Sequence, residues 1–342
     1  MQTVKLGKSE LVVPKNGFGA LPIQRISNND AVYLIQKALD HGMYYFDTAR
    51  FYTDSESKMG EALHDRRDKV VISTKTGATT VEAFWKDLET SLSLLRTDYI
   101  DLYQFHNPSF CPKPGDGTGL YEAMQSAMAQ GKVRHIGITN HRLAVASEAI
   151  ESGLYDTLQF PFSYLASDKE LALVDACAKQ NVGFIAMKGL AGGLINHAAT
   201  AYAYLAQFPH VAPIWGVQRE CELDEFISFQ DNPPILTDEM LQRINHDREE
   251  LSGDFCRGCG YCQPCPMGIE IESCNRMYLF LRRAPYSVYL TDAFAEKMKQ
   301  VEQCIECGQC KSKCPYGLDI PVLLKRNYED FKEHWSRKDE LL

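Results

Sequence analysis

The chain has 342 residues, 45% of them hydrophobic, which is enough for a large core and more than one typical domain needs. One barrel of about 250 residues with an appendage fits this length. The formal net charge of −9 argues against a general nucleic-acid binder. The sequence shows no secretion signal and no run of about twenty apolar residues, so we expect a cytoplasmic protein with no membrane partner.

Strand-like apolar runs alternate with helix-like segments through the first two thirds of the chain, the pattern of βα units on a parallel sheet. We expect strands at 16–20, 44–47, 70–74, 99–105, 135–139, 157–160, 182–187 and 212–216. We expect helices at 30–41, 55–63, 80–96, 120–130, 143–152, 170–180 and 198–208. Eight strands in this arrangement predict an α/β fold, a (β/α)8 TIM barrel over residues 1–235.

The last third of the chain has a different composition. Asn232-Pro233-Pro234 should end the last barrel helix, and a charge-rich helix should form a connector over 236–253. Nine of the twelve cysteines follow residue 255, which marks a second domain over 254–342. Within it, residues 275–303 predict a helix, a turn at Ala284-Pro285 and another helix, and Pro321 should open a C-terminal helix. This domain should therefore be small and mainly helical.

Chemically useful side chains stand at the ends of three predicted strands. Asp47 ends the second strand, Lys75 directly follows the third, His106 directly follows the fourth, and Tyr52 follows Asp47 by five residues. In a parallel barrel all strand carboxyl ends meet at one mouth, where catalytic groups collect. Each residue alone also has an ordinary structural explanation, such as a surface carboxylate or a packed tyrosine. The four together predict an active site.

This set resembles the catalytic tetrad of the aldo-keto reductases. The matching stretches are Phe46-Asp47-Thr48-Ala49 with Tyr52, Thr74-Lys75, Tyr103-Gln104-Phe105-His106, and residues 131–140, and the resemblance covers about residues 1–230. It implies that Tyr52 is the general acid for carbonyl reduction and that Lys75 lowers the pKa of its phenol. Asp47 would hold Lys75 in place, and His106 would orient the substrate oxygen.

The same resemblance implies a nicotinamide cofactor, NADP(H) or NAD(H). The residues it assigns to cofactor contacts are Ala20, Thr139, Asn140, Gln159, Met187, Lys188, Gly189, Leu190, Gly216, Gln218, Arg219 and Glu225. Met187 stands where the family often has a tyrosine that stacks on the nicotinamide. Gln218 replaces the cation that usually holds the 2′-phosphate, with Arg219 as the alternative cation, and Phe226 replaces an asparagine that contacts adenine. The choice between NADPH and NADH stays open.

The cysteines form two runs. The second, with Cys304, Cys307, Cys310 and Cys314-Pro315, matches the ferredoxin spacing C-x2-C-x2-C-x3-C-P, in which the fourth cysteine ligates the other cluster. We therefore predict two 4Fe–4S clusters, one held by Cys256, Cys259, Cys262 and Cys314, the other by Cys304, Cys307, Cys310 and Cys265. The first run is one residue short before Cys265, which leaves Cys274 as the alternative ligand. Zinc is the alternative metal, although its sites usually use pairs of C-x2-C.

The chain is thus similar to aldo-keto reductases that carry a C-terminal two-cluster ferredoxin-type domain. The resemblance implies an enzyme that interconverts a small-molecule carbonyl and an alcohol, with a ferredoxin as a further candidate partner. Two other functions stay open: an electron-transfer protein whose barrel docks a partner, and an iron- or oxygen-responsive binding protein on a barrel scaffold. The clusters could be structural, or they could relay electrons.

Overall fold

The computed structural model describes residues 2–251, 255–283 and 286–342. The chain divides into two compact units, the first with residues up to Leu190 and His197–Ile244, the second with Ala191–Asn196 and Asn245–Leu342. The domain boundaries expected at 235 and 254 stay predictions, and residue 254 lies outside the described residues. In the described residues, no helix is both long enough and apolar enough to cross a bilayer.

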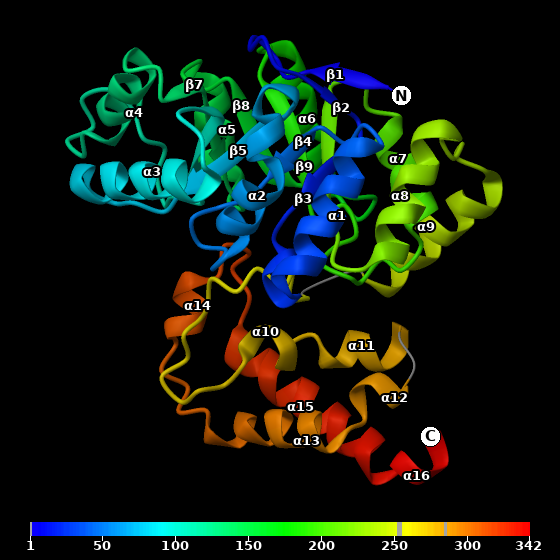
Figure 1. Cartoon of the computed structure of the whole chain (residues 1–342). Helices are drawn as coiled ribbons and strands as arrows, with labels where there is room; N and C mark the ends of the chain where they lie inside the picture. Colours follow the sequence, from blue (N-terminus) through cyan, green and yellow to red (C-terminus); the bar gives the residue numbers. More distant parts are fainter. Residues whose placement is uncertain (1, 252–254, 284–285) are drawn as a thin grey trace. The chain divides into compact units, whose positions relative to one another are not determined.

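The first unit is a closed barrel of eight parallel strands, which confirms the predicted fold (Figure 1). The strands are β3 (Gly17–Gly19), β4 (Tyr45–Asp47), β5 (Val71–Thr76), β6 (Ile100–His106), β7 (Val133–Thr139), β8 (Thr157–Pro161), β9 (Gly183–Met187) and β10 (Val211–Gly216). β10 pairs with β3 and closes the ring. Since β3 to β9 pair in chain order, every strand carboxyl end reaches the same mouth.

Helices follow the strands, as βα units require. They are η1 (Pro22–Arg25), α1 (Asn28–Asp40), α2 (Ser55–Leu63), η2 (His64–Lys69), α3 (Val81–Leu95), α4 (Leu120–Ala129), α5 (Leu143–Ser152), α6 (Asp168–Lys179), α7 (Ala198–Ala206) and α8 (Glu220–Asp231). Side-chain caps fix several starts: the Ser27 hydroxyl accepts the Asp30 N–H at α1, and Ser167 and Glu170 form a capping box at α6. A further helix, α9 (Asp238–Glu250), carries the chain from the first unit into the second.

The sequence analysis missed an N-terminal hairpin, β1 (Thr3–Lys5) with β2 (Val12–Pro14). Its inward residues Val4 and Val13 pack with Leu102 and Ile185 from the barrel strands. The hairpin therefore covers apolar side chains inside the barrel. Three-residue strands are too short for alternation of polar and apolar residues to be a clear signal.

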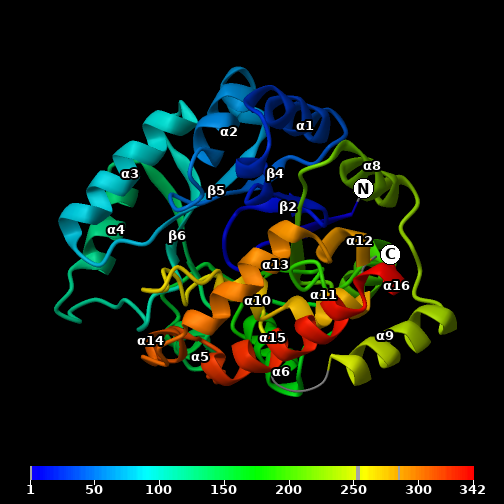
Figure 2. The same cartoon turned by 90° about the horizontal axis from the view of Figure 1, so that it is seen from below.

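In the described part of the second unit, the regular elements are all helices, joined by loops. It contains α10 (Ile271–Cys274), α11 (Met277–Arg283), α12 (Tyr286–Tyr289), α13 (Asp292–Lys299), η3 (Gln300–Gln303), α14 (Gln309–Lys313), α15 (Ile320–Ser336) and α16 (Lys338–Leu341). The long helix α15, which Pro321 helps to open as predicted, packs against α10, α11, α13 and α14 (Figure 2). The turn predicted at Ala284-Pro285 lies outside the described residues. Leu281, Met298, Leu324 and Phe331 contribute to one buried apolar cluster.

Gly60 on α2 allows the close approach of this helix to α3. A methyl group at this position would overlap the backbone carbonyl of Leu94. We expect Gly60→Ala to lower the free energy of unfolding by about 1–3 kcal/mol, because backbone has to move to make room. Denaturant unfolding measures this, with Glu61→Ala on the exposed side of α2 as the control, expected to change stability by less than about 0.5 kcal/mol. Equal stability of the two variants would contradict the packing argument.

Candidate active site at the barrel mouth and cysteine site of the second unit

A buried ion pair lies at the carboxyl ends of β4 and β5. The Lys75 Nζ is 2.6 Å from Oδ2 of Asp47, and the two side chains are 1% and 2% exposed. Lys75 also donates to the carbonyl oxygen of Thr48 at 2.6 Å, and the Ser73 hydroxyl donates to Oδ1 of Asp47. Burial lowers the pKa of Lys75, and the interaction with Asp47 opposes that shift. Asp47 therefore favours the ammonium form and fixes its position.

Two buried glutamines extend this network. Gln159 Nε2 donates to Oδ2 of Asp47 at 3.2 Å, and Gln104 Nε2 donates to Oε1 of Gln159 at 2.8 Å. Sequence analysis missed Ser73 and Gln104. Alternation along a strand could have identified both residues. Ser73 lies two residues before Lys75, and Gln104 lies two residues before His106, so each pair points to the same side of its strand.

Tyr52 and His106 lie at the same mouth. The Lys75 Nζ is 5.5 Å from the centroid of the Tyr52 ring, and the His106 ring stands edge-on to Tyr52 with centroids 5.9 Å apart. Burial, and then the charge of Lys75, lowers the pKa of His106 to about 3. The imidazole is therefore neutral near pH 7 and can donate one N–H. The structure brings together all four residues of the predicted catalytic set.

The loop that carries Tyr52 is anchored at both ends. Arg50 forms an ion pair with buried Glu56, and Glu56 also accepts from the hydroxyls of Thr74 and Ser91 at 2.7 Å. The Ser55 hydroxyl donates to the carbonyl oxygen of Ala20 at 2.9 Å. Glu56 was not predicted as a site residue, and no local motif in one sequence distinguishes it from a surface carboxylate. These contacts limit the freedom of Tyr52 relative to Lys75.

The predicted nicotinamide-contact residues come from neighbouring strand ends. Thr139 ends β7 and its hydroxyl is 3.9 Å from the Met187 sulfur at the end of β9. The Asn140 side chain donates to the carbonyl of Pro108 at 2.9 Å and accepts the N–H of His141 at 2.9 Å. Four further residues were predicted to contact the cofactor. Ala20 and Gly189 are buried, and Lys188 and Leu190 are half-buried. Because Gly189 has no side chain, the ring of Trp215 can pack closely against it. Thr139, Asn140, Gln159 and Met187 thus line the end of the barrel that carries Tyr52.

The start of α8 is acidic. The Arg219 guanidinium pairs with Glu222 at 2.7 Å, and Glu222 also accepts the backbone N–H of Gln218 at 3.0 Å. Gly216 and Glu225 are exposed, whereas Phe226 is buried and stacks on Trp215 with centroids 4.6 Å apart. Arg219 therefore already has an anionic partner.

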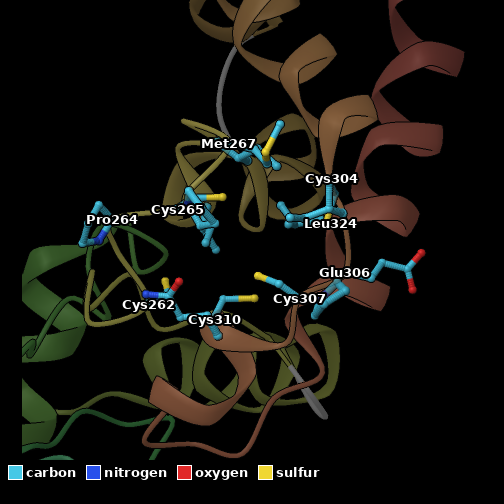
Figure 3. A pocket seen from close by; sticks show the side chains of 15 residues that line it. Cys262, Pro264, Cys265, Met267, Cys304, Glu306, Cys307, Cys310 and Leu324 are labelled. Carbon is cyan, nitrogen blue, oxygen red and sulfur yellow. The ribbon is translucent and has the colours of Figure 1, made fainter.

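In the second unit, five cysteines line one cavity: Cys262, Cys265, Cys304, Cys307 and Cys310. Figure 3 shows the Cys265, Cys307 and Cys310 sulfurs directed toward the space between the two cysteine runs. The cavity thus joins Cys265 to the three cysteines of the second run. Cys274, the alternative ligand, is fully buried elsewhere, and its thiol lies 3.6 Å from the carbonyl oxygen of Lys297.

The first cysteine run is also compact. Burial, followed by the nearby Cys256 and Cys259 thiols, raises the pKa of Cys262 to about 12. The backbone N–H of Gly258 points at the Cys256 sulfur at 3.4 Å, a contact that would stabilise a thiolate. Cys314 is half-buried beside the apolar cluster of this unit. Within the described residues, no three His, Cys, Asp or Glu side chains converge on the position of one metal ion.

Comparison with known proteins gave matches in both units. The model of the aldo/keto reductase family matches residues 15–212, and a 4Fe-4S dicluster domain matches residues 255–319. Curated relatives include an L-galactose dehydrogenase from Arabidopsis thaliana, 29% identical over 56% of this chain and 66% of its own length. A methylglyoxal reductase from Salmonella typhi is 34% identical over 41% of this chain and 52% of its own. The matched segment thus spans between half and two thirds of these two relatives.

Solved structures resemble the barrel. An aldo-keto reductase from Klebsiella pneumoniae in complex with NADPH superimposes with a TM-score of 0.63 and 24% identity, over 72% of this chain and 94% of that chain. The holo form of an aldo-keto reductase from Bacillus halodurans gives the same TM-score with 22% identity, over 72% and 96%. At these identities the likeness establishes the fold. Because the family model covers more than half of the residues, this chain belongs to the aldo/keto reductase family, and its C-terminal region carries a 4Fe-4S dicluster domain.

Proposed function

We propose that the barrel is an NAD(P)H-dependent oxidoreductase that interconverts a small-molecule carbonyl and an alcohol, with Tyr52 as general acid and base. The observation that carries this proposal is the placement of one buried ammonium, Lys75, between Asp47 and the Tyr52 ring. A charge held there favours the phenolate and so lowers the energy of proton transfer from Tyr52.

The geometry supports one role for each of these residues. A bound nicotinamide supplies a hydride to the carbonyl carbon. Tyr52 gives its proton to the carbonyl oxygen as negative charge develops there, and Lys75 stabilises the phenolate that is left. Neutral His106, edge-on to Tyr52, donates a hydrogen bond that orients the same oxygen. In the oxidation direction Tyr52 takes the alcohol proton.

The residues present fit the nicotinamide end of the cofactor better than a 2′-phosphate. Thr139, Asn140 and Met187 present polar and polarisable groups at the barrel mouth. At the start of α8 the Glu222 carboxylate engages Arg219 and would repel a phosphate. We therefore assign NADH as the preferred cofactor, although the Klebsiella relative is a complex with NADPH.

The second unit fits two 4Fe–4S clusters. Thiolates are the ligands that such clusters use, and cysteines of the second run share a cavity with Cys265, as the crossed-ligand spacing requires. We assign Cys304, Cys307, Cys310 and Cys265 to one cluster and Cys256, Cys259, Cys262 and Cys314 to the other. A bound cluster would exchange single electrons, whereas the barrel reaction moves two, so we propose that the clusters mainly stabilise this unit.

An electron-transfer role has one supporting observation. Cys307 is exposed, and neighbouring Ile305 is 62% exposed, so a cluster held there would lie near the surface. A ferredoxin is the partner that such a surface would suit. This second function is compatible with the barrel reaction.

Tyr52→Phe should reduce turnover by about 10²- to 10⁴-fold, because the proton donor is lost while the ring remains. An anaerobic screen of carbonyls and alcohols against NADH and NADPH provides the substrate. Nicotinamide binding, followed by fluorescence titration, should change little and serves as the control. Undiminished turnover of the variant would exclude Tyr52 as the general acid.

Gln218→Lys should raise the affinity for NADPH relative to NADH by several-fold, since an ammonium near the ribose can meet the 2′-phosphate. Titration of both nucleotides gives the ratio of dissociation constants. Gln130→Lys, which adds the same charge at the exposed C-cap of α4, is the control and should leave the ratio unchanged. A ratio that does not respond to Gln218→Lys would mean that Gln218 does not face the ribose.

Cys307→Ser should remove one of two clusters, seen as a fall in bound iron from about eight to about four atoms per chain. If the clusters are structural, the second unit should unfold at a lower temperature while anaerobic turnover with nicotinamide continues. Cys221→Ser, an exposed cysteine of the first unit, is the matched control and should keep all its iron. Loss of hydride transfer in a folded Cys307→Ser protein would instead indicate that the clusters take part in the reaction.

A further inference from the structure

Arg142 lies beside the candidate active site, and no carboxylate among the described residues pairs with it. Arg142 follows β7 at the barrel mouth and is half-buried. Its Nη1 is 3.5 Å from Oδ1 of Asn107, the residue directly after His106. Within the described part of the chain, Arg142 forms no ion pair, whereas Arg50 and Arg67, also shielded from solvent, pair with Glu56 and Asp101.

The surroundings of Arg142 hold its position. The Asn107 N–H donates to the carbonyl of Thr139 at 2.8 Å, which ties the end of β6 to the end of β7. Oδ1 of Asn107 accepts the His141 N–H at 3.2 Å in addition to its contact with Arg142. The backbone N–H of Arg142 donates to Oδ1 of Asn140 at 2.8 Å. The guanidinium therefore lies against Asn107, the residue next to His106, whose imidazole would orient the substrate oxygen.

The local charge is positive although the whole chain is acidic. Burial, and then the charges of Lys188, His106 and Arg142, lowers the pKa of His141, so these groups lie around one buried ring. Residues 106–115 and 139–147 contain no aspartate or glutamate. The first acid that follows on α5, Glu148, is paired with Lys113. No acidic residue occupies the first turn of α5, so its N-terminal dipole adds to the positive potential.

Leaving a shielded guanidinium without a counterion is unfavourable, and a planar guanidinium matches the two oxygens of a carboxylate. We infer that Arg142 binds a carboxylate of the substrate, so that the enzyme acts on carbonyl compounds that also carry a carboxylate, such as 2-oxo acids. This inference rests on the proposed function of the barrel. Phe51, which is 72% exposed and edge-on to His106 at 5.8 Å between centroids, offers an apolar surface to the rest of such a molecule.

The test compares phenylglyoxylate with its methyl ester, which has the same ring and ketone but no charge. Binding of each to the full-length protein is measured anaerobically by isothermal titration calorimetry, with and without bound NAD⁺, which cannot reduce the ketone during the titration. We expect the acid to bind at least about tenfold more tightly than the ester. In Arg142→Gln the two affinities should differ by less than about twofold, with the loss confined to the acid.

Arg25 provides the matched control. It lies on η1 in another loop that follows a strand carboxyl end, and it is exposed. Arg25→Gln removes the same charge and should leave the preference for the acid unchanged. If Arg142→Gln fails to fold, as judged by its melting curve, Arg142→Lys replaces it and should lose most of the preference, because an ammonium lacks the bidentate fork.

Three results would overturn the inference: equal binding of acid and ester by the wild-type protein, an unchanged preference in the folded Arg142 variant, or weaker NADH binding as that variant's only defect. The last would mean that Arg142 contacts the cofactor. Turnover of the ester is measured separately and tests the proposed function. If the ester is turned over but the acid is not bound more tightly, only the assignment of Arg142 is wrong. If the acid is bound more tightly but neither compound is turned over, only the proposed reaction is wrong.

Discussion

The buried ion pair of Asp47 and Lys75 is the interaction on which the rest of the barrel mouth depends. Removing two charges from water is costly, and only good geometry and additional hydrogen bonds offset the cost. Here the Ser73 hydroxyl, the Thr48 carbonyl and the Gln159 amide provide those bonds. Removing one partner of such a pair typically costs about 3–5 kcal/mol, because the other charge stays buried. The pair therefore couples the stability of the barrel to the chemistry at its mouth.

The second unit depends on a different constraint. Its helices are short apart from α15, and its apolar cluster is interleaved with the cysteines that would bind iron, including Cys262, Cys265 and Cys310. Small domains with little core of their own commonly rely on metal or disulfide cross-links. Two cubanes held by ligands from both runs would connect the segment near 256–265 to the segment near 304–314, which the chain alone joins only through 38 intervening residues.

The distribution of charge at the barrel mouth bears on both ligands. The protein as a whole is acidic, and the start of α8 carries Glu220, Glu222 and Asp224 against Lys37 and Arg219. Beside the ends of β6 and β7, the cation Arg142 has no nearby acid in sequence. One edge of the mouth therefore disfavours additional phosphate, and another favours an anion. The proposed dinucleotide without a 2′-phosphate and the proposed substrate with a carboxylate would fit this distribution of charge.

The sequence by itself determined the parts that local pattern encodes. Eight apolar runs separated by helical segments predicted the barrel, since the period of apolar residues depends only on which side of each element is buried. Asp47, Lys75 and His106 stood out because they end such runs, and the cysteine runs stood out by spacing. The hairpin of β1 and β2 escaped because three-residue strands carry almost no periodic signal.

Tertiary structure decided what depends on residues far apart in sequence. Gln104 and Gln159, 55 residues apart, meet only because β6 to β8 are neighbours in the ring. Glu56 is buried and accepts hydrogen bonds from Thr74 and Ser91 because α2 packs against α3 and β5. The Phe226 side chain is buried because it stacks on Trp215. That no carboxylate in the described part of the chain pairs with Arg142 was likewise not readable from sequence, because ion pairing depends on which carboxylates the fold brings within a few ångströms. A residue's type and neighbours in the chain specify its chemistry, whereas its partners are set by the closure of the barrel.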